Sequence, residues 1–237
     1  MLSPSGTHNP APRVAALIPA YREERHIGKV VRDALRHGDE VWVVDDGSPD
    51  QTGQRAEAAG AHVIRHDFNR GKGASIKTGL LALMKGTADY VVLLDGDGQH
   101  RPDEIPRFVE AARKHNVGFV IGNRFENARG MPVIRKMVNR YMSTRISKIA
   151  GSSIPDTQCG FRLLRRDIIP NVLGETDHFD METEMIFLAA QSGCKIANVP
   201  VSTIYGEEES KIHPWHDTIR FLRLMKKWRK RFLQRHA

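Results

Sequence analysis

The chain has 237 residues, of which 40% are hydrophobic and 27% charged, and it carries a formal net charge of +8. This balance is ordinary for a globular protein with a real core, and it excludes a membrane-spanning protein, because no window approaches the roughly 18 apolar residues of a span. We expect no secretory signal, since no basic segment followed by an apolar one occurs in the first residues given. We expect a cytosolic protein with reduced Cys159 and Cys194, one disulfide being the alternative.

Strand and helix patterns alternate through the first half of the chain. Residues 91–94 are apolar without alternation, which is typical of a strand covered on both faces. The expected strands are 14–18, 40–44, 62–65 and 90–94, and the expected helices are 27–35, 50–59 and one that begins after Gly73. This order predicts an α/β fold with a mainly parallel central sheet flanked by helices.

The second half is less regular, and it holds no internal repeat or linker. We expect helices at 102–115, 133–149 and 181–191, strands at 117–121, 161–164 and 195–199, and a terminal helix. The sequence therefore predicts a single domain at 13–212, preceded by a flexible leader at 1–12 and followed by a basic amphipathic helix at 213–237.

Three expected strands end in clusters of polar residues. The clusters are IPAYREE (18–24), VVDDGSPD (43–50) and LLDGDGQH (93–100). Parallel strands bring their carboxyl ends to one edge of a sheet, so the clusters should share a crevice. In the third cluster Asp95, Asp97 and Gln99 are spaced two apart and can converge on a hard cation. For an isolated D-x-D, however, a simple turn at the end of a strand is the commoner explanation.

The first two clusters suit a nucleotide. Tyr21 can pack on a base, while Glu23 and the Asp45–Asp46 pair can accept hydrogen bonds from ribose hydroxyls or base N–H groups. Each of these carboxylates is as often a helix cap or a turn residue. The NRGKG segment (69–73) adds Lys72 before a helix, where a diphosphate can be held.

Together these motifs resemble an inverting glycosyltransferase of family 2 with a GT-A (Rossmann-like) fold, in the branch of dolichyl- and polyprenyl-phosphate sugar transferases. The likeness covers about residues 13–212. Its motifs occur in family order and are IPAYREE, VDDGSPD, DGDGQ, GNR (122–124), DTQCGFR (156–162) and ESK (209–211).

The resemblance implies a nucleotide-sugar donor, UDP- or GDP-linked, and a Mg²⁺ or Mn²⁺ ion on its diphosphate. The ion would be bound by Asp95, Asp97 and Gln99, of which Asp97 would be essential for transfer. The remaining donor contacts that the resemblance implies are Pro19, Tyr21, Glu23, Asp45, Asp46 and Lys72. The base and the sugar stay open.

By the same resemblance the acceptor is a polyprenyl phosphate. It would be held by Arg124, Arg135, Arg140, Ser210 and Lys211, although a solvated helix face also explains Arg135 and Arg140. A saccharide hydroxyl is the alternative acceptor, and it would need a general base. Asp156, which we favour, or Glu182 could be that base, or either could be a structural partner of Arg162.

The C-terminal residues carry an apolar stripe. It consists of Phe221, Leu224, Met225, Trp228 and Phe232. Because cations fill the remaining positions, we expect residues 217–236 to bind an anionic membrane surface and to hold the protein peripherally on the cytoplasmic face. The alternative is a terminal helix packed on the domain.

Two classes without catalysis compete with the enzyme. A nucleic-acid binder would account for the basic tail but not for three acidic strand ends around one crevice, so we expect no nucleic acid as partner. A nucleotide-sugar-binding module would share the crevice and differ only in lacking turnover. The sequence leaves the oligomeric state open.

Overall fold

A computed structural model describes residues 11–126, 131–174, 180–204, 224–232 and 234 of the chain. Its centre is a seven-stranded sheet with strand order β3-β2-β1-β4-β6-β5-β7. The strands are β1 (Val14–Ala20), β2 (Glu40–Asp45), β3 (His62–Arg65), β4 (Tyr90–Leu93), β5 (Phe119–Asn123), β6 (Arg162–Arg165) and β7 (Ile196–Pro200). No helix in these described ranges is long and apolar enough to span a membrane.

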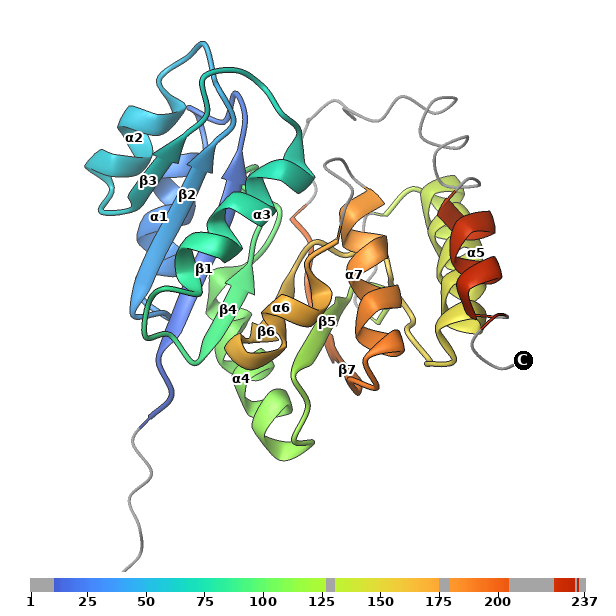
Figure 1. Cartoon of the computed structure of the whole chain (residues 1–237). Coiled ribbons are helices and arrows are strands. Elements are labelled where there is room, and N and C mark those ends of the chain that lie inside the picture. Colours follow the sequence, from blue (N-terminus) through green and yellow to red (C-terminus); the bar gives the residue numbers. More distant parts are fainter. Residues whose placement is uncertain (1–10, 127–130, 175–179, 205–223, 233, 235–237) are drawn as a thin grey trace, which may run out of the picture.

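Helices cover both faces of the sheet (Figure 1). They are α1 (Ile27–Ala34), α2 (Thr52–Ala58), α3 (Lys72–Leu83), α4 (Ile105–Lys114), α5 (Val133–Ala150), α6 (Ile169–Val172) and α7 (Asp180–Gln191), with short 3₁₀ turns before α4 and α6. On one face α1 and α2 pack together and α4 packs on β5, β6 and β7. On the other face α3 packs on β1 and β2, and α7 contacts α3, α5 and α6.

The predicted α/β fold is confirmed, and the sheet departs from parallel pairing at β6 alone among the described strands. This strand runs antiparallel to β4 on one side and to β5 on the other, whereas β1, β2, β3 and β4 are paired in parallel and β5 pairs in parallel with β7. Two reversals in succession leave β4 and β5 pointing the same way. The carboxyl ends of six strands therefore lie along one edge.

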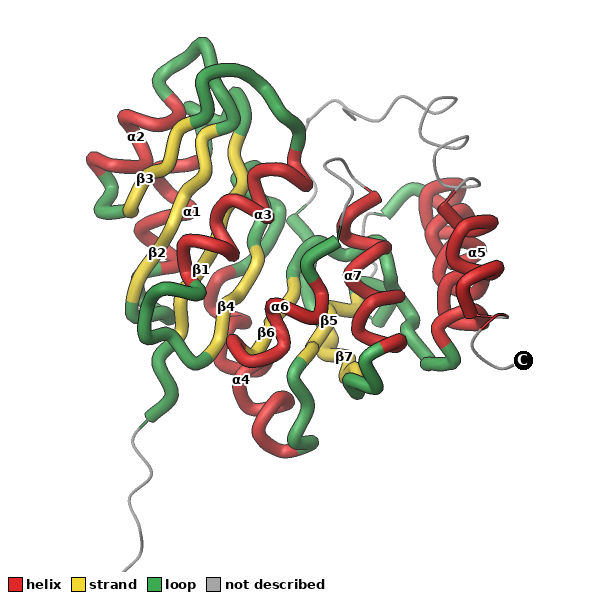
Figure 2. Tube along the Cα trace, in the orientation of Figure 1, coloured by secondary structure: helices red, strands yellow, loops and turns green. Residues whose placement is uncertain are grey.

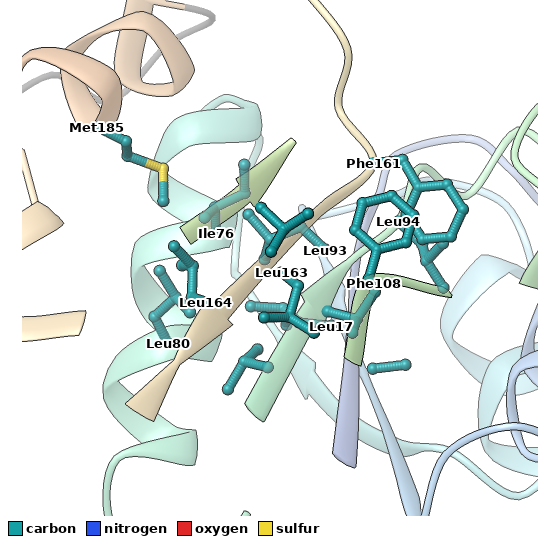
Figure 3. Packing of buried hydrophobic residues seen from close by; sticks show 14 of the residues in the cluster. Leu17, Ile76, Leu80, Leu93, Leu94, Phe108, Phe161, Leu163, Leu164 and Met185 are labelled. Carbon is teal, nitrogen blue, oxygen red and sulfur yellow. The ribbon is translucent and has the colours of Figure 1, made fainter. Parts of the chain in front are cut away.

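The sheet is buried between the two helical layers. Every residue of β1 and of β4 is buried, which explains why their sequences are apolar without alternation. Figure 3 shows the centre of this core, where Leu17 of β1 lies near Leu93 of β4 and the ring of Phe108 lies close to that of Phe161. These two rings stack with centroids 4.3 Å apart. The core thus fixes the strand ends on which the candidate site is built.

The described part of the C-terminal tail packs on the domain, which corrects the expected use of its apolar stripe. Residues 224–232 are helical, and Leu224, Met225 and Trp228 are buried. The Trp228 ring stacks on Phe187 of α7 at 5.3 Å. A stripe that is buried against α7 is not exposed to lipid, so the alternative of a packed terminal helix holds for these residues. Phe221 lies outside the described residues.

Candidate active site

The three polar clusters meet at the carboxyl edge of the sheet, as the sequence predicts. Arg22 donates its backbone N–H to Ser48 Oγ at 3.1 Å, which joins the loops after β1 and β2. A Cβ placed on Gly96, after β4, would lie 3.4 Å from the Glu23 side chain. Figure 2 shows these loops in green at one edge of the strands. Pro19, expected as a donor contact, is a buried residue next to the carboxyl end of β1.

A cation and two carboxylates form the centre of the site. Lys72, the first residue of α3, places its Nζ 2.6 Å from Asp95 Oδ1 and 3.3 Å from Glu182 Oε2. These three residues come from α3, from the loop after β4 and from α7. The other carboxylate oxygen of Glu182 is buried without a hydrogen-bond partner. The buried Oε1 of Glu182 therefore lacks a donor, although Glu182 Oε2 lies beside the ammonium of Lys72.

Electrostatics keep the Lys72–Asp95 pair ionised. Burial alone would raise the pKa of Asp95, but the ammonium of Lys72 and then the ring of His100 outweigh it and hold the pKa below its usual value. For Lys72, burial acts to lower the pKa, and the charges of Asp95 and Glu182 outweigh that effect and raise it. Both groups are therefore charged at neutral pH.

The loop after β4 is a turn that presents its carboxylates. Gln99 donates its backbone N–H to Asp97 Oδ1 at 2.9 Å, and both side chains are half-buried. His100 is buried, and its Nδ1 accepts the backbone N–H of Asp95 at 3.1 Å. No role for His100 was predicted, because nothing in its spacing distinguishes it from a turn residue. In the structure His100 fixes the backbone that carries Asp95.

Gly160 lets the chain pass close to the ion pair. A Cβ on this residue would lie 2.8 Å from Asp95 Oδ2 and 3.2 Å from Lys72 Nζ. Contacts this short require Asp95 or Lys72 to move. The glycine of the DTQCGFR motif therefore has a physical reason that the sequence alone did not reveal.

We expect Gly160→Ala to impair turnover more than folding. The added methyl group displaces Asp95 or Lys72, and misplacing reactive groups by about 1 Å costs on the order of 10²-fold in rate. Gly28→Ala is the matched control, since a Cβ there meets only ordinary contacts, the nearest at 3.4 Å. Steady-state rates and thermal unfolding of both variants give the measurement. Equal rates for the two variants would contradict this role of Gly160.

Asp45 and Asp46 have partners within the protein. Asp45 is fully buried and accepts the backbone N–H of Ser48. Asp46 accepts the backbone N–H groups of Arg70 and Gly71 and lies 2.7 Å from His66 Nδ1. The pair therefore shapes the turn after β2 and the NRGKG segment that leads to Lys72. The sequence had left this turn role open beside nucleotide binding.

Asp156 is paired with Arg124, at the carboxyl end of β5. Its Oδ2 accepts hydrogen bonds from Arg124 Nε at 2.7 Å and from the Arg124 backbone N–H at 3.2 Å. Its Oδ1 accepts one from Nη2 at 2.9 Å. Asp156 is fully buried. A carboxylate held by three donors away from solvent is poorly suited to accept a proton, so this geometry favours a structural role over the expected base.

Arg162 does not pair with either expected carboxylate. It is fully buried and donates to the backbone carbonyls of Thr157, Cys159 and Glu182. The guanidinium thus ties the DTQCGFR segment to the start of α7. This contact places Glu182 in the site. The expected ion pair with Arg162 is replaced by hydrogen bonds to main-chain oxygens.

The expected acceptor cations are divided among different places. Arg135 and Arg140 lie on α5, the first half-buried and the second exposed. Arg124 is the partner of Asp156 in the core. Ser210 and Lys211 fall outside the described residues. Of the expected acceptor cations that the structure describes, only Arg135 and Arg140 on α5 therefore remain as a cationic surface beside the site.

The residues present fit a divalent cation on a diphosphate. Within the described residues no group of three or more His, Cys, Asp or Glu side chains forms a metal cluster. Magnesium is commonly held by one or two carboxylates with phosphate oxygens completing its shell, which suits Asp95, Asp97 and the amide of Gln99. The Lys72 ammonium that pairs with Asp95 and the unpartnered oxygen of Glu182 indicate that this part of the site favours positive charge.

Comparison of the sequence with known proteins gives one family and several relatives. The profile of Glycosyl transferase family 2 matches residues 15–173. The UDP-N-acetylglucosamine–dolichyl-phosphate N-acetylglucosaminyltransferase of Methanococcus voltae is 29% identical over 215 residues, covering 81% of this chain and 85% of that protein. The undecaprenyl-phosphate mannosyltransferase of Micrococcus luteus is 31% identical over 215 residues, covering 84% and 87%.

Solved structures give the same fold. The glucosyl-3-phosphoglycerate synthase of Mycobacterium tuberculosis in complex with UDP superposes with a TM-score of 0.75 at 19% identity, covering 92% of this chain and 80% of that one. A structure of the same enzyme with Mg²⁺ and UDP has a TM-score of 0.68 at 21% identity, covering 84% and 73%. This likeness confirms the expected GT-A architecture.

Proposed function

Since the chain belongs to glycosyl transferase family 2, we propose that it transfers a sugar, with inversion, from a nucleoside-diphosphate sugar to a polyprenyl phosphate. The observation that carries the proposal is the cluster of Asp95, Lys72 and Glu182 at the carboxyl edge of the sheet. Open α/β sheets bind ligands at this edge. The reaction needs a leaving diphosphate and an anionic acceptor to be held there together.

The donor end of the site is assigned to the loops after β1, β2 and β4. Tyr21 offers an aromatic face for a base, and Glu23 lies beside the D-x-D loop. Lys72 and the carboxylates Asp95 and Asp97 surround the proposed place of the diphosphate. A bound Mg²⁺ or Mn²⁺ would supply neutralisation of the charge that develops on the leaving diphosphate. Solved structures of the M. tuberculosis enzyme with UDP and Mg²⁺ or Mn²⁺ support this donor class.

The acceptor end is supported by what the relatives act on and by charge. The two relatives named above use dolichyl phosphate and, by name, undecaprenyl phosphate. A phosphomonoester is already anionic at neutral pH, so it needs cations to position it and no base to deprotonate it. Arg135 and Arg140 are proposed for this task. Asp156, being held by Arg124, is not required as a base.

Transfer assays with radiolabelled UDP- and GDP-sugars test the proposal. We expect metal-dependent formation of a lipid-linked sugar when detergent-dispersed polyprenyl phosphate is supplied, and loss of product in excess EDTA. Free saccharides and 3-phosphoglycerate serve as hydroxyl acceptors in parallel reactions. Transfer to these with none to polyprenyl phosphate would contradict the proposed acceptor. Metal-dependent binding of every donor without any turnover would reduce the protein to a binding module.

A further inference from the structure

An apolar face is exposed on the first turns of helix α5. Five of the nine large hydrophobic side chains that are exposed among the described residues lie on it, and they are Val133, Ile134, Met137, Val138 and Tyr141. Their spacing places them on one side of the helix. The residues Val133 and Ile134 are 73% and 78% exposed. Ser143 and Ile146, on the opposite side, are buried toward the domain.

This face is also surrounded by positive charge. From residue 131 to residue 155 the sequence has five Lys and Arg and no Asp or Glu. Arg145 and Lys148 continue the apolar side of the helix toward its C-terminal end, and both are exposed. An exposed apolar patch on a folded protein commonly marks an interaction surface, and a helix that pairs such a patch with cations suits an anionic membrane interface.

The position of α5 connects this surface with the site. The strand that precedes it, β5, points the same way as β4, so α5 follows the edge at which Asp95 lies. In Figure 1 the N-terminal end of α5 is on the same side of the molecule as the carboxyl ends of β1 and β2. Ser143 of α5 hydrogen-bonds Thr157, next to Asp156. The helix is therefore fixed to the DTQCGFR segment.

We propose that α5, and not the C-terminal tail, is the surface by which the protein lies on an anionic lipid bilayer. Val133, Ile134, Met137, Val138 and Tyr141 enter the interface between headgroups and acyl chains, while Arg145 and Lys148 reach the anionic headgroups. A second copy of the chain is disfavoured as the occupant, because two such faces would bring cations against cations. The reason for a lipid surface rests on the proposed function, whereas its location on α5 rests on the structure.

Vesicle binding of the full chain tests this location. The variant I134S/M137S/Y141S removes exposed apolar groups only, so it should fold as the wild type does in thermal unfolding. We expect wild-type protein to co-sediment with vesicles of phosphatidylcholine and phosphatidylglycerol. The vesicle affinity of this triple variant should be at least roughly tenfold lower. Leu81→Ser, at an exposed apolar residue of α3, is the matched control and should bind as the wild type.

A second variant tests the charge. R145E/K148E should weaken binding to the anionic vesicles, and wild-type binding should fall in high salt and on phosphatidylcholine alone. Unchanged co-sedimentation of the triple variant would overturn the proposal. So would equal binding of the wild type to both kinds of vesicle, or a wild-type dimer that the triple variant converts to monomer while vesicle binding is unchanged.

Activity separates this inference from the proposed function. With detergent-dispersed polyprenyl phosphate, where no bilayer is needed, the triple variant should transfer sugar at the wild-type rate. A wild-type protein that binds anionic vesicles through α5 but never glycosylates polyprenyl phosphate would overturn the proposed function and leave the surface standing. Loss of transfer in detergent together with intact vesicle binding would place these side chains in the acceptor site and overturn the inference.

Discussion

Replacing Asp97 with asparagine is expected to lower turnover by about 10²–10³-fold while leaving the fold intact. The reason is the loss of one of the two carboxylates proposed to hold the metal on the leaving diphosphate. The asparagine oxygen can still accept the Gln99 N–H bond that Asp97 Oδ1 accepts at 2.9 Å, so the turn is preserved. Initial rates at saturating donor and acceptor, with thermal unfolding of both proteins, give the measurement.

Asp167→Asn is the control for this variant. It removes the same charge at an exposed ion pair with Arg165, which pairs with Tyr90 at the start of β4 and so lies at the opposite edge of the sheet from Asp97, and it should have the wild-type rate. Wild-type activity in the Asp97 variant, or full activity of the wild type after chelation of divalent metals, would show that no metal at this loop is needed. A loss of activity that merely follows a loss of folded protein would also count against the proposed role.

Replacing Asp156 with alanine is expected to lower the free energy of unfolding by about 3–5 kcal/mol. The substitution leaves the buried guanidinium of Arg124 without its partner, which costs more than the pair itself contributes. Removing both partners in R124M/D156L replaces the pair by apolar side chains of similar size, and it should be less destabilised than D156A. Chemical denaturation of R124M, D156L and the double variant measures this coupling.

Replacement of Asp156 by asparagine decides between a structural and a catalytic role. As a base, Asp156 would lower turnover on replacement by asparagine without a matching loss of stability. As a structural partner, its Asn variant should lose stability and keep turnover at temperatures where it is folded. Additive effects of R124M and D156L on the free energy of unfolding would argue against the pairing.

Much of this protein could be predicted from local sequence. The helix expected at 133–149 is α5 (Val133–Ala150), and the strand expected at 90–94 is β4 (Tyr90–Leu93). Apolar periodicity is a local property of the sequence, so it indicates where a helix or strand forms without reference to the elements that later pack against it. The approach of three polar clusters was also predictable, since parallel strands align their carboxyl ends. These regularities were enough to indicate the fold and the edge that bears the site.

Only the tertiary structure decided which polar groups pair and which apolar stripe is covered. Asp156 and Arg124 are 32 residues apart, and nothing in their spacing distinguishes an ion pair from a base and an acceptor cation. Gly160 acquires its role because a distant Asp95–Lys72 pair packs against its backbone. Two basic stretches with apolar stripes look alike in the sequence. Trp228 of the C-terminal stretch is buried because it packs on Phe187 of α7, whereas Ile134 of α5 is exposed. Burial depends on what lies opposite each stripe.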